Sequence, residues 1–590
     1  MKHFLLALFF GTLVCPVFAK DVLTSSDEKL YRNIFEVQQK EDWKKADKYI
    51  AELKDKSLMG HVLAQRYFSK TWNTRAKEVE EWMRKYSDHP QANRMYNLGI
   101  KKKAKLPQKQ PVPLYGGRAG TCSAIYRAEP TDSIENLSFS YLSGDKRKKA
   151  KKTMRQIVKY IKAGRTLNAR QLIEGKDAKT LFNQRDHDAA RIALAFSYFL
   201  DGMDNKVFEM AEKAVARSGD KLPLGHWTLG LSAWRSGKIE LAAYHFDKVV
   251  NHTKTYPLLK SAAAFWASRA NLKLGNFAVV NSYLEIAANS PRTFYGIMAA
   301  RALGQDLNHA WAKPVLPEDD VTETFSHPTF ERVLALKQVG LDKIANDELA
   351  ALFLHADMDT RALLMAVAEK NGIAADLTRI AGNLDSDDDA PRYPAPDWEP
   401  ETGWTVDKAL VFAFVKQESC FNEKAKSSVG ATGLMQLMPS NAREIARRLK
   451  LKWDQKKLTE PEYNLALGQN YLQWLMKDKQ IQNNLLFTAV AYNSGPGNLY
   501  KLKNKMKYGN DPLLFVESIP FRETRGFVER IMANYWIYQT LMDQSVPSLD
   551  NLIEVVGLFM LIRMRRQFVN RKIKGIFDPF FRIDLVPMDD

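Results

Sequence analysis

A glutamate, Glu418, stands at the end of an apolar helical pattern. Val406, Leu410, Phe414 and Glu418 recur every four residues, and residues four apart lie on one face of an α-helix. Apolar surroundings and the exposed carbonyls of a helix C-terminus both disfavour a charged carboxylate, so both raise its pKa. A carboxyl group that stays protonated near neutral pH can act as the general acid that cleaves a glycosidic bond.

A loop and a glycine turn follow this glutamate. Gly430 and Gly433 permit positive φ angles and a close approach of the backbone to a ligand. Pro439 followed by Ser440 is typical of the start of a new helix, with Ser440 as its N-cap. A lone glutamate at a helix end is more often an ordinary polar residue than a catalytic group, so this pattern alone leaves both interpretations open.

Three segments, in order, resemble the catalytic motifs of the soluble, goose-lysozyme-like class of lytic transglycosylases. The first comprises Glu418-Ser419, Ser427 and the sequence GATGLMQLMP at 430–439. The second is AYNSGPG at 491–497, in which Ser494 replaces the usual alanine, and the third is IPFRETRGFV at 519–528. Three motifs with the order and spacing of the family are far more specific than a single glutamate.

The resemblance implies a mechanism with one acid. Glu418 would protonate the oxygen that links N-acetylmuramic acid to N-acetylglucosamine, and the ionised Glu418 would then deprotonate the C6 hydroxyl of the sugar. Attack by that hydroxyl closes a 1,6-anhydro ring without water, because proximity replaces an external nucleophile. The nearest other carboxylates in the sequence, Glu423 and Asp407, are expected to point elsewhere.

The same resemblance gives supporting roles to further residues of the three motifs. Those expected to bind substrate are Ser427, Met435, Gln436, Met438, Tyr492 and Glu523, and those expected to support the site are Ser419 and Asn493. The two methionines would line apolar sugar faces, although methionine is more often part of a core. Glu523 would either bind a substrate amide or support the groove, or it would form a structural ion pair with Arg525 or another basic residue.

The predicted function is that of a peptidoglycan lytic transglycosylase that produces 1,6-anhydro-N-acetylmuramic acid ends. One alternative is a hydrolytic muramidase on the same fold, which would need a second carboxylate to activate water. Another is a non-catalytic periplasmic scaffold that binds cell-wall synthesis proteins. The resemblance implies no cofactor and no metal, and the sequence shows no CxxC motif or cysteine–histidine cluster.

The elements that must position these motifs are helical, and strand signals are scarce. Repeated helical hairpins, such as the tetratricopeptide-like segment from Leu224 to Phe246, stack into a solenoid because no hairpin can bury its apolar face alone. We therefore predict an all-α fold, an N-terminal superhelical α-solenoid followed by a lysozyme-like α-helical domain. The predicted divisions are a signal peptide at 1–19, helical hairpins at 20–100, a basic Pro/Gly-rich linker at 101–152, solenoid and linker helices at 153–390, the lysozyme-like domain at 391–545 and a basic, apolar tail at 546–590.

The formal net charge is +19, which favours an anionic partner such as peptidoglycan or anionic lipid. Nucleic acid is excluded by the expected secretion of the chain. Six of the seven residues from Lys146 to Lys152 are basic; we interpret them as part of a solvated linker, with an electrostatic tether as the alternative. The tail offers either a packing helix or a weak contact with a membrane surface.

The first residues have the pattern of a secretory signal. Lys2 and His3 precede an apolar run, and Val17 to Ala19 form a cleavage site, so we expect a periplasmic protein. We expect no lipid on Cys15, because Val14 stands where a lipobox needs a small residue. Cys122 and Cys420 lie in different predicted domains, so we expect two free thiols.

Overall fold

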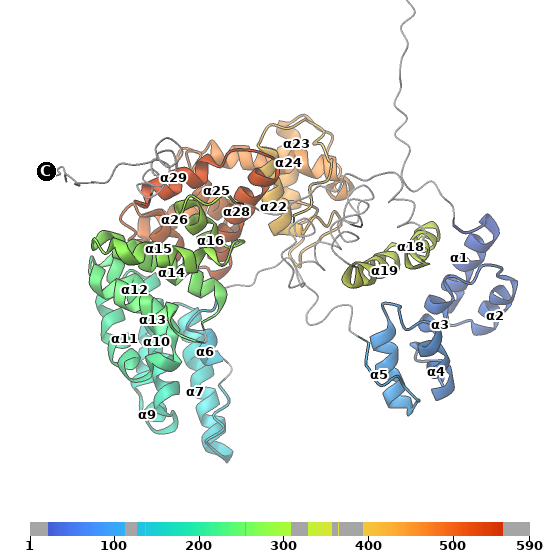
Figure 1. Ribbon diagram of the computed structural model, residues 1–590, viewed down its shortest axis with the longest axis horizontal. Coiled ribbons are helices and arrows are strands. Elements are labelled where there is room, and N and C mark those ends of the chain that lie inside the picture. The colour runs from blue at the N-terminus through green and yellow to red at the C-terminus, as the bar shows by residue number, and fades with distance from the viewer. Residues whose placement is uncertain are drawn as a thin grey trace, which may run out of the picture.

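The computed structural model describes residues 22–111, 127–135, 137–253, 255–307, 328–356, 364 and 393–558. The predicted signal peptide, Cys15, Cys122 and the tail beyond residue 558 lie outside the described residues. The described parts are helices joined by turns and loops, without a β-strand among them (Figure 1). Two isolated β-bridges occur, between Lys426 and Thr432 and between Thr432 and Leu437. The predicted all-α fold class is confirmed.

The solenoid consists of helices that pack mainly on their neighbours in the chain (Figure 1). Close packing within a hairpin depends on Gly230, because a Cβ atom there would lie 2.7 Å from the ring of Phe246 on the next helix. Pro223 and Pro257 occupy the first positions of their helices, where a missing N–H costs nothing. The helices are α6 (Asp132–Glu135), α7 (Gly144–Lys162), α8 (Thr166–Glu174), α9 (Lys176–Leu181), α10 (Gln184–Leu200), α11 (Asp204–Ser218), α12 (Pro223–Arg235), α13 (Ile239–Val250), α14 (Pro257–Lys273), α15 (Phe277–Ala288) and α16 (Phe294–Ala302).

The basic run at 146–152 forms the first half of α7. The interpretation as linker is therefore wrong for these residues, because Ala150, Met154 and Ile157 give the segment an apolar face that is buried. The lysine side chains on the other face are exposed to solvent.

The C-terminal helices surround one central helix, α28 (Arg522–Leu541), which packs against α22, α25 and α16. The others are α22 (Lys408–Ser419), α23 (Pro439–Arg448), α24 (Pro461–Met476), α25 (Leu485–Ser494), α26 (Pro496–Lys505), α27 (Pro512–Ser518) and α29 (Pro547–Val555). One hydrophobic core spans these helices and the solenoid. The first residues of the predicted tail form α29, which buries Leu549, Leu552 and Ile553 against this core.

Buried polar contacts join the solenoid to the C-terminal helices. The guanidinium group of Arg127 donates to both carboxylate oxygens of Glu517, at 2.8 and 2.7 Å, and to Glu529 at 2.6 Å. The hydroxyl of Tyr295 donates to Glu517 at 2.6 Å. Further along, Arg269 pairs with Asp511 at 2.8 Å. These contacts satisfy charges that would be costly to bury alone, so they fix one part of the core relative to the other.

The N-terminal helices form separate, smaller cores. They are α1 (Ser25–Gln39), α2 (Trp43–Glu52), α3 (Met59–Tyr67), α4 (Ala76–Lys85) and α5 (Ala92–Lys102). Helices α18 (Pro328–Gln338) and α19 (Asp342–His355) share a core with α1 and α3. The Gln338 side chain accepts from the backbone N–H groups of Val22 and Leu23 at 3.1 and 3.0 Å. Residues 328–356 thus pack on the N-terminal helices, although the sequence grouped them with the solenoid.

A buried polar cluster holds α19 to the N-terminal helices. Glu348 lies 2.7 Å from Nε2 of His61 and 3.4 Å from Nδ1 of His89, and Arg332 donates to both of its oxygens at 3.1 Å. The ligand atoms of the two histidines and Glu348 lie within 4.8 Å of one another, a spacing that a metal ion could bridge. Arg332 already balances the carboxylate charge, so the arrangement fits an ion pair better than a cation site. Burial lowers the pKa of His89 to about 3, which keeps this ring neutral.

Replacing Glu348 tests how much this cluster contributes to the stability of the fold. Glu348→Ala leaves the Arg332 charge buried without its main partner, so we expect a loss of about 3–5 kcal/mol in the free energy of unfolding. Chemical denaturation followed by far-UV circular dichroism measures the change. The matched control is Asp88→Ala, which removes the exposed partner of Arg332 and is expected to cost no more than about 1 kcal/mol. Equal effects of the two variants would contradict the buried pair as the main contact.

Candidate active site

Glu418 lies in the last turn of α22, as the sequence predicted. The side chain of Asp407 caps the start of this helix by accepting from the N–H of Ala409 at 3.0 Å, and Cys420 ends it with a left-handed φ of 56°. The residues from Ala409 to Val415 are all buried. Because α22 is packed in the core along this length, the position of Glu418 at the end of the helix is fixed. Glu418 itself stays partly accessible to solvent.

The surroundings hold the Glu418 carboxyl in its protonated form. Burial, with a smaller contribution from the negative charge of Glu523, raises the pKa of Glu418 to about 8. The sequence predicted the direction of this shift and its main cause. The second cause is Glu523 rather than the helix end. Within the described residues no hydrogen-bond donor reaches the Glu418 carboxyl, so its charged form gains no compensating stabilisation there.

The loop after α22 is held in shape by its own side chains. Gly430 and Gly433 have φ angles of 92° and 82°, which confirms the predicted glycine turn. At Gly433 a Cβ atom would lie 2.0 Å from the carbonyl oxygen of Leu458, so no other residue fits. The Ser427 hydroxyl accepts from the N–H of Ala431 at 3.0 Å. The amide nitrogen of Gln436 donates to two backbone carbonyls of the loop, those of Ala425 at 3.1 Å and Gly433 at 2.9 Å.

The two methionines have different environments. Met435 is fully buried, and its sulfur packs against Gly468, where a Cβ atom would lie 2.0 Å away. Its side chain therefore belongs to the core, which was the plainer of the two expectations. Met438 is 38% exposed and immediately precedes α23, so only this methionine can offer an apolar surface to a sugar.

Tyr492 links α25 to the loop beside Glu418. Its hydroxyl donates to the carbonyl of Met435 at 2.7 Å, and its ring packs 4.6 Å from that of Phe414 on α22. Burial raises the pKa of Tyr492 well above its usual value, and the charge of Glu418 adds to the shift. The phenol therefore stays protonated close to the glutamate.

The supporting residues predicted from the motifs make local contacts. The hydroxyl of Ser419 donates to the carbonyl of Val415 at 3.1 Å, one turn earlier in α22. The side-chain oxygen of Asn493 accepts from the Thr524 hydroxyl at 2.6 Å, which ties the end of α25 to the start of α28. Ser419 and Asn493 thus hold helix ends in place.

Glu523 is exposed in the first turn of α28. The expected alternative, an ion pair with Arg525, is wrong, because Arg525 points into the core and pairs with Glu129. Arg525 also donates to the carbonyl of Ile519 at 2.7 Å, while Arg522 pairs with Asp132 at 2.7 Å. The residues on both sides of Glu523 are therefore held by the segment at 127–135, and the charge of Glu523 acts on Glu418.

Sequence reasoning missed the role of this segment. Arg127, Glu129 and Asp132 lie far from the three motifs in the chain, within the stretch interpreted as linker. Alternating charges next to prolines gave no sign of a buried contact. Only the fold brings these residues to the start of α28.

Cys420, two residues after Glu418, is disulfide-bonded. The expectation of a free thiol at this position is therefore wrong. Its partner lies outside the described residues. The expectation rested on the separation of the cysteines in different predicted domains, and such separation in sequence says nothing about separation in space.

Comparisons with known proteins identify the kind of domain that holds this site. Residues 398–513 match the model of the transglycosylase SLT domain, and residues 518–547, which include α28, match that of the soluble lytic transglycosylase helical domain. The chain thus carries a transglycosylase SLT domain. Among curated proteins it is related to the soluble lytic murein transglycosylases, which confirms the resemblance first seen in the three motifs.

The Salmonella typhimurium soluble lytic murein transglycosylase is 32% identical over 291 residues, which cover 48% of this chain and 44% of that protein. The chain therefore matches less than half the length of this relative. The crystal structure of the 70 kDa soluble lytic transglycosylase of Escherichia coli has the same fold, with a TM-score of 0.62 at 20% identity over 89% of this chain and 98% of that one. An inactive glutamate-to-glutamine mutant of lytic transglycosylase Slt from Pseudomonas aeruginosa superposes with a TM-score of 0.61 at 18% identity, over 88% of this chain and 98% of that one.

The influence of Glu523 on Glu418 can be measured directly. Removing the neighbouring negative charge in Glu523→Gln makes the ionised form of Glu418 less unfavourable, so we expect its pKa to fall from about 8. Carbon-13 NMR titration of labelled glutamate side chains reports this pKa. Glu444→Gln, which removes an exposed carboxylate paired with Arg447, serves as the control and leaves the pKa unchanged. A pKa that stays the same in Glu523→Gln would contradict the coupling.

Proposed function

We propose that this protein is a lytic transglycosylase that cleaves the β-1,4 bond between N-acetylmuramic acid and N-acetylglucosamine in peptidoglycan. The observation that carries the proposal is the partly accessible carboxyl of Glu418, whose pKa of about 8 leaves most of it protonated at neutral pH. Its place in an SLT domain and the relation to soluble lytic murein transglycosylases support the choice of substrate.

In the proposed reaction Glu418 acts twice. Its proton passes to the glycosidic oxygen as the bond to C1 breaks, and the N-acetylglucosamine residue leaves with a free C4 hydroxyl. The resulting Glu418 carboxylate takes the proton of the C6 hydroxyl of N-acetylmuramic acid. The C6 oxygen bonds to C1 and closes the 1,6-anhydro ring, so Glu418 ends protonated and no water is consumed. The high pKa suits both steps, because it also makes the carboxylate a stronger base.

Other residues around Glu418 contact the sugar, fix the loop or adjust the pKa of the acid. The amide oxygen of Gln436, the Ser427 hydroxyl and the side chain of Met438 are the groups of the loop that we assign to contacts with the sugar. Tyr492, with its pKa raised well above the usual range, remains a neutral donor whose hydroxyl fixes the loop to α25. Glu523 raises the pKa of the acid and offers a carboxylate to amide groups of the substrate.

A hydrolytic muramidase is the second candidate, and one observation favours it. Glu523 is an exposed carboxylate close enough to Glu418 to raise its pKa, so it could activate a water molecule in the manner of an inverting glycosidase. The two candidates differ in their products, since hydrolysis adds a water molecule that the intramolecular reaction does not.

The proposed cell compartment is the periplasm, where the substrate lies. Among the helices that the structure describes, none has the length and apolar character needed to cross a membrane. Proteins of cell-wall synthesis remain proposed partners.

Glu418→Gln tests the assigned acid. Glutamine fits the same space and cannot transfer a proton, so we expect turnover of peptidoglycan to fall by about 10²- to 10⁴-fold while binding of the glycan is kept. Release of soluble muropeptides measures turnover, and co-sedimentation with insoluble peptidoglycan measures binding. The control is Glu462→Gln, which changes an exposed glutamate of the same domain. Activity near that of the unchanged protein would rule out Glu418 as the acid.

Product analysis separates the two reactions. We expect mass spectrometry to find muropeptide ends that lack one water relative to hydrolysed ends, and no incorporation of ¹⁸O from labelled water. Glu523→Gln is expected to keep this product, because the intramolecular reaction needs no base for water. Reducing ends that carry ¹⁸O, lost in Glu523→Gln, would instead establish the muramidase.

A further inference from the structure

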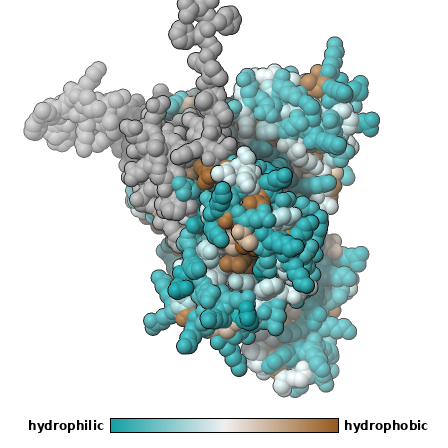
Figure 2. Space-filling model, turned by 90° about the vertical axis from the view of Figure 1, so that its right-hand side faces the viewer, coloured by the Kyte–Doolittle hydropathy of each residue, from teal (hydrophilic) through white to brown (hydrophobic). Residues whose placement is uncertain are grey.

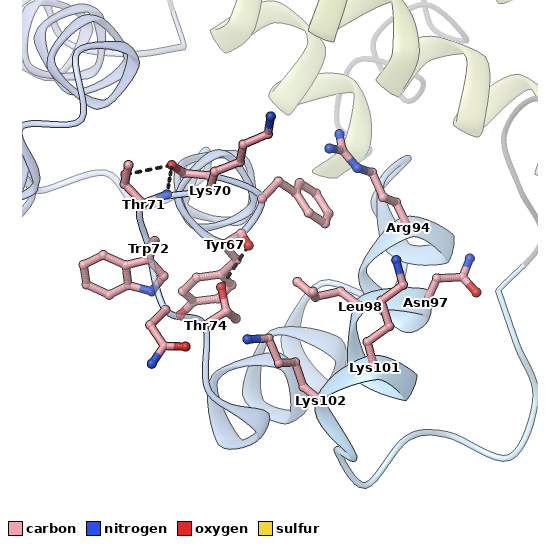
Figure 3. A pocket seen from close by; sticks show the side chains of 13 residues that line it. Tyr67, Lys70, Thr71, Trp72, Thr74, Arg94, Asn97, Leu98, Lys101 and Lys102 are labelled. Atoms are coloured by element: carbon pink, nitrogen blue, oxygen red, sulfur yellow. Dashed lines mark hydrogen bonds between the residues drawn. The ribbon is translucent and has the colours of Figure 1, made fainter.

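A cleft lies among the N-terminal helices, outside the core that holds Glu418. Its volume is about 630 Å³, and its walls are the end of α3, the loop that follows and one face of α5 (Figure 3). The loop wall is braced internally: the Thr74 hydroxyl donates to the carbonyl of Tyr67 at 2.9 Å, and the hydroxyls of Ser69 and Thr71 lie 3.1 Å apart. The cleft is therefore a formed feature of this part of the fold.

The lining of the cleft is strongly cationic. It contains Lys70, Arg94, Lys101 and Lys102, and no acidic residue. Within the described residues none of these four side chains forms an ion pair. Arg94, Asn97 and Lys101 recur along α5 at the spacing of one helix face, and Figure 3 shows them on the helix that borders the cleft, across from the loop with Lys70. Four positive charges without counter-charges around one concave surface favour an anionic ligand.

Aromatic rings and neutral donors complete the lining. The guanidinium group of Arg94 lies 4.0 Å from the ring centroid of Phe68, so its planar donors are partly ordered before any ligand arrives. Tyr67, Phe68 and Trp72 contribute ring surface, and Asn73 and Asn97 contribute amides. A ligand for this cleft thus has carboxylates together with amide and small apolar groups, which is the chemistry of a short acidic peptide.

We propose that the cleft binds the carboxylate-bearing peptide stems of peptidoglycan, a binding site additional to the one around Glu418. The inference rests on the proposed function, which identifies peptidoglycan as the polymer that this protein meets. Phosphate headgroups of a membrane share the negative charge. Membrane headgroups are disfavoured because they form a flat surface, whereas this site is concave. In addition, the side of the molecule with α1 and α2 is mostly hydrophilic, with only small hydrophobic areas that could insert into a bilayer (Figure 2).

The site would act through binding alone. The helices that form it pack in a core of their own, distinct from the one that contains α22 and α28, so the cleft contributes nothing to proton transfer. A second contact on the same polymer raises the effective concentration of glycan near Glu418. Loss of the cleft therefore weakens action on intact peptidoglycan and leaves the rate on short, peptide-free glycan fragments unchanged.

The test compares two double variants of the full chain. Arg94→Ala with Lys101→Ala removes two exposed cations of the cleft, and Arg84→Ala with Lys85→Ala removes an exposed arginine and lysine from neighbouring α4. With Glu418→Gln added to prevent turnover, the affinity for insoluble peptidoglycan is measured by co-sedimentation. We expect about a fivefold weakening in the cleft variant only, which corresponds to two exposed charge contacts. Free stem tetrapeptide should compete with the polymer, and its carboxyl-amidated form should not.

The outcomes distinguish this inference from the proposed function. In the Glu418-containing chain, anhydro products from peptide-free fragments test the function alone. If such products form but both double variants bind peptidoglycan equally well, the cleft proposal is overturned while the function stands. If the cleft variant keeps peptidoglycan binding and loses binding to vesicles with anionic phospholipid, the ligand is a membrane headgroup and the proposal is again overturned.

Discussion

The poor solvation of one carboxyl group is the constraint on which the rest of the site depends. Glu418 keeps its proton because ionisation at the end of a buried helix is unfavourable and because Glu523 opposes a second negative charge. Each condition needs a rigid frame. The core must hold α22 in place along its length, and the loop from 420 to 438 must stay close to Glu418. Helix α28 must begin at a point from which the charge of Glu523 acts on Glu418. A shift of any of these elements would admit water and return the pKa of Glu418 toward its ordinary value.

The frame extends beyond the SLT domain. Arg127 and Glu129 lie just before α6 and Asp132 is its first residue, yet they hold Glu517, Arg525 and Arg522 around the start of α28. Tyr295 on α16 adds its hydroxyl to the same network. The segment at 127–135 and the solenoid therefore help to set the position of Glu523 through their polar contacts. Buried charges of this kind are costly when one partner is missing, so the network favours a single arrangement of the two parts.

Local patterns in the sequence were enough for the parts of the site that are local in the chain. The four-residue spacing from Val406 to Glu418 predicted the helix, its buried face and the direction of the pKa shift. Gly430 and Gly433 predicted the turn because only glycine tolerates their φ angles without strain. The hairpins of the solenoid followed from small and aromatic residues at helical spacing. In each case the physical cause lies within a few residues.

What the sequence did not predict depends on contacts between distant segments. The pairing of Arg525 with Glu129, the packing of α18 and α19 on α1 and α3, and the disulfide of Cys420 leave no local signature. The basic residues of α7 led to the wrong prediction of a linker for another reason. Their charges dominate the sequence of this segment, whereas the apolar helix face formed by Ala150, Met154 and Ile157 is a weaker pattern. Met435 shows the limit of motif reasoning, because its motif position says nothing about whether its side chain faces the ligand or the core.

The Arg127 network also bears on how this protein can change over evolution. Glu517 and Glu529 lie in the C-terminal helices, and their common partner enters from a segment that precedes the solenoid, nearly four hundred positions away in the chain. Recombination that exchanges only the C-terminal helices from α22 to α29 between relatives would bring carboxylates into a buried space that lacks their guanidinium group. The two segments must therefore be inherited together, and substitutions at 127–132 and 517–529 are expected to vary as a correlated set among homologues.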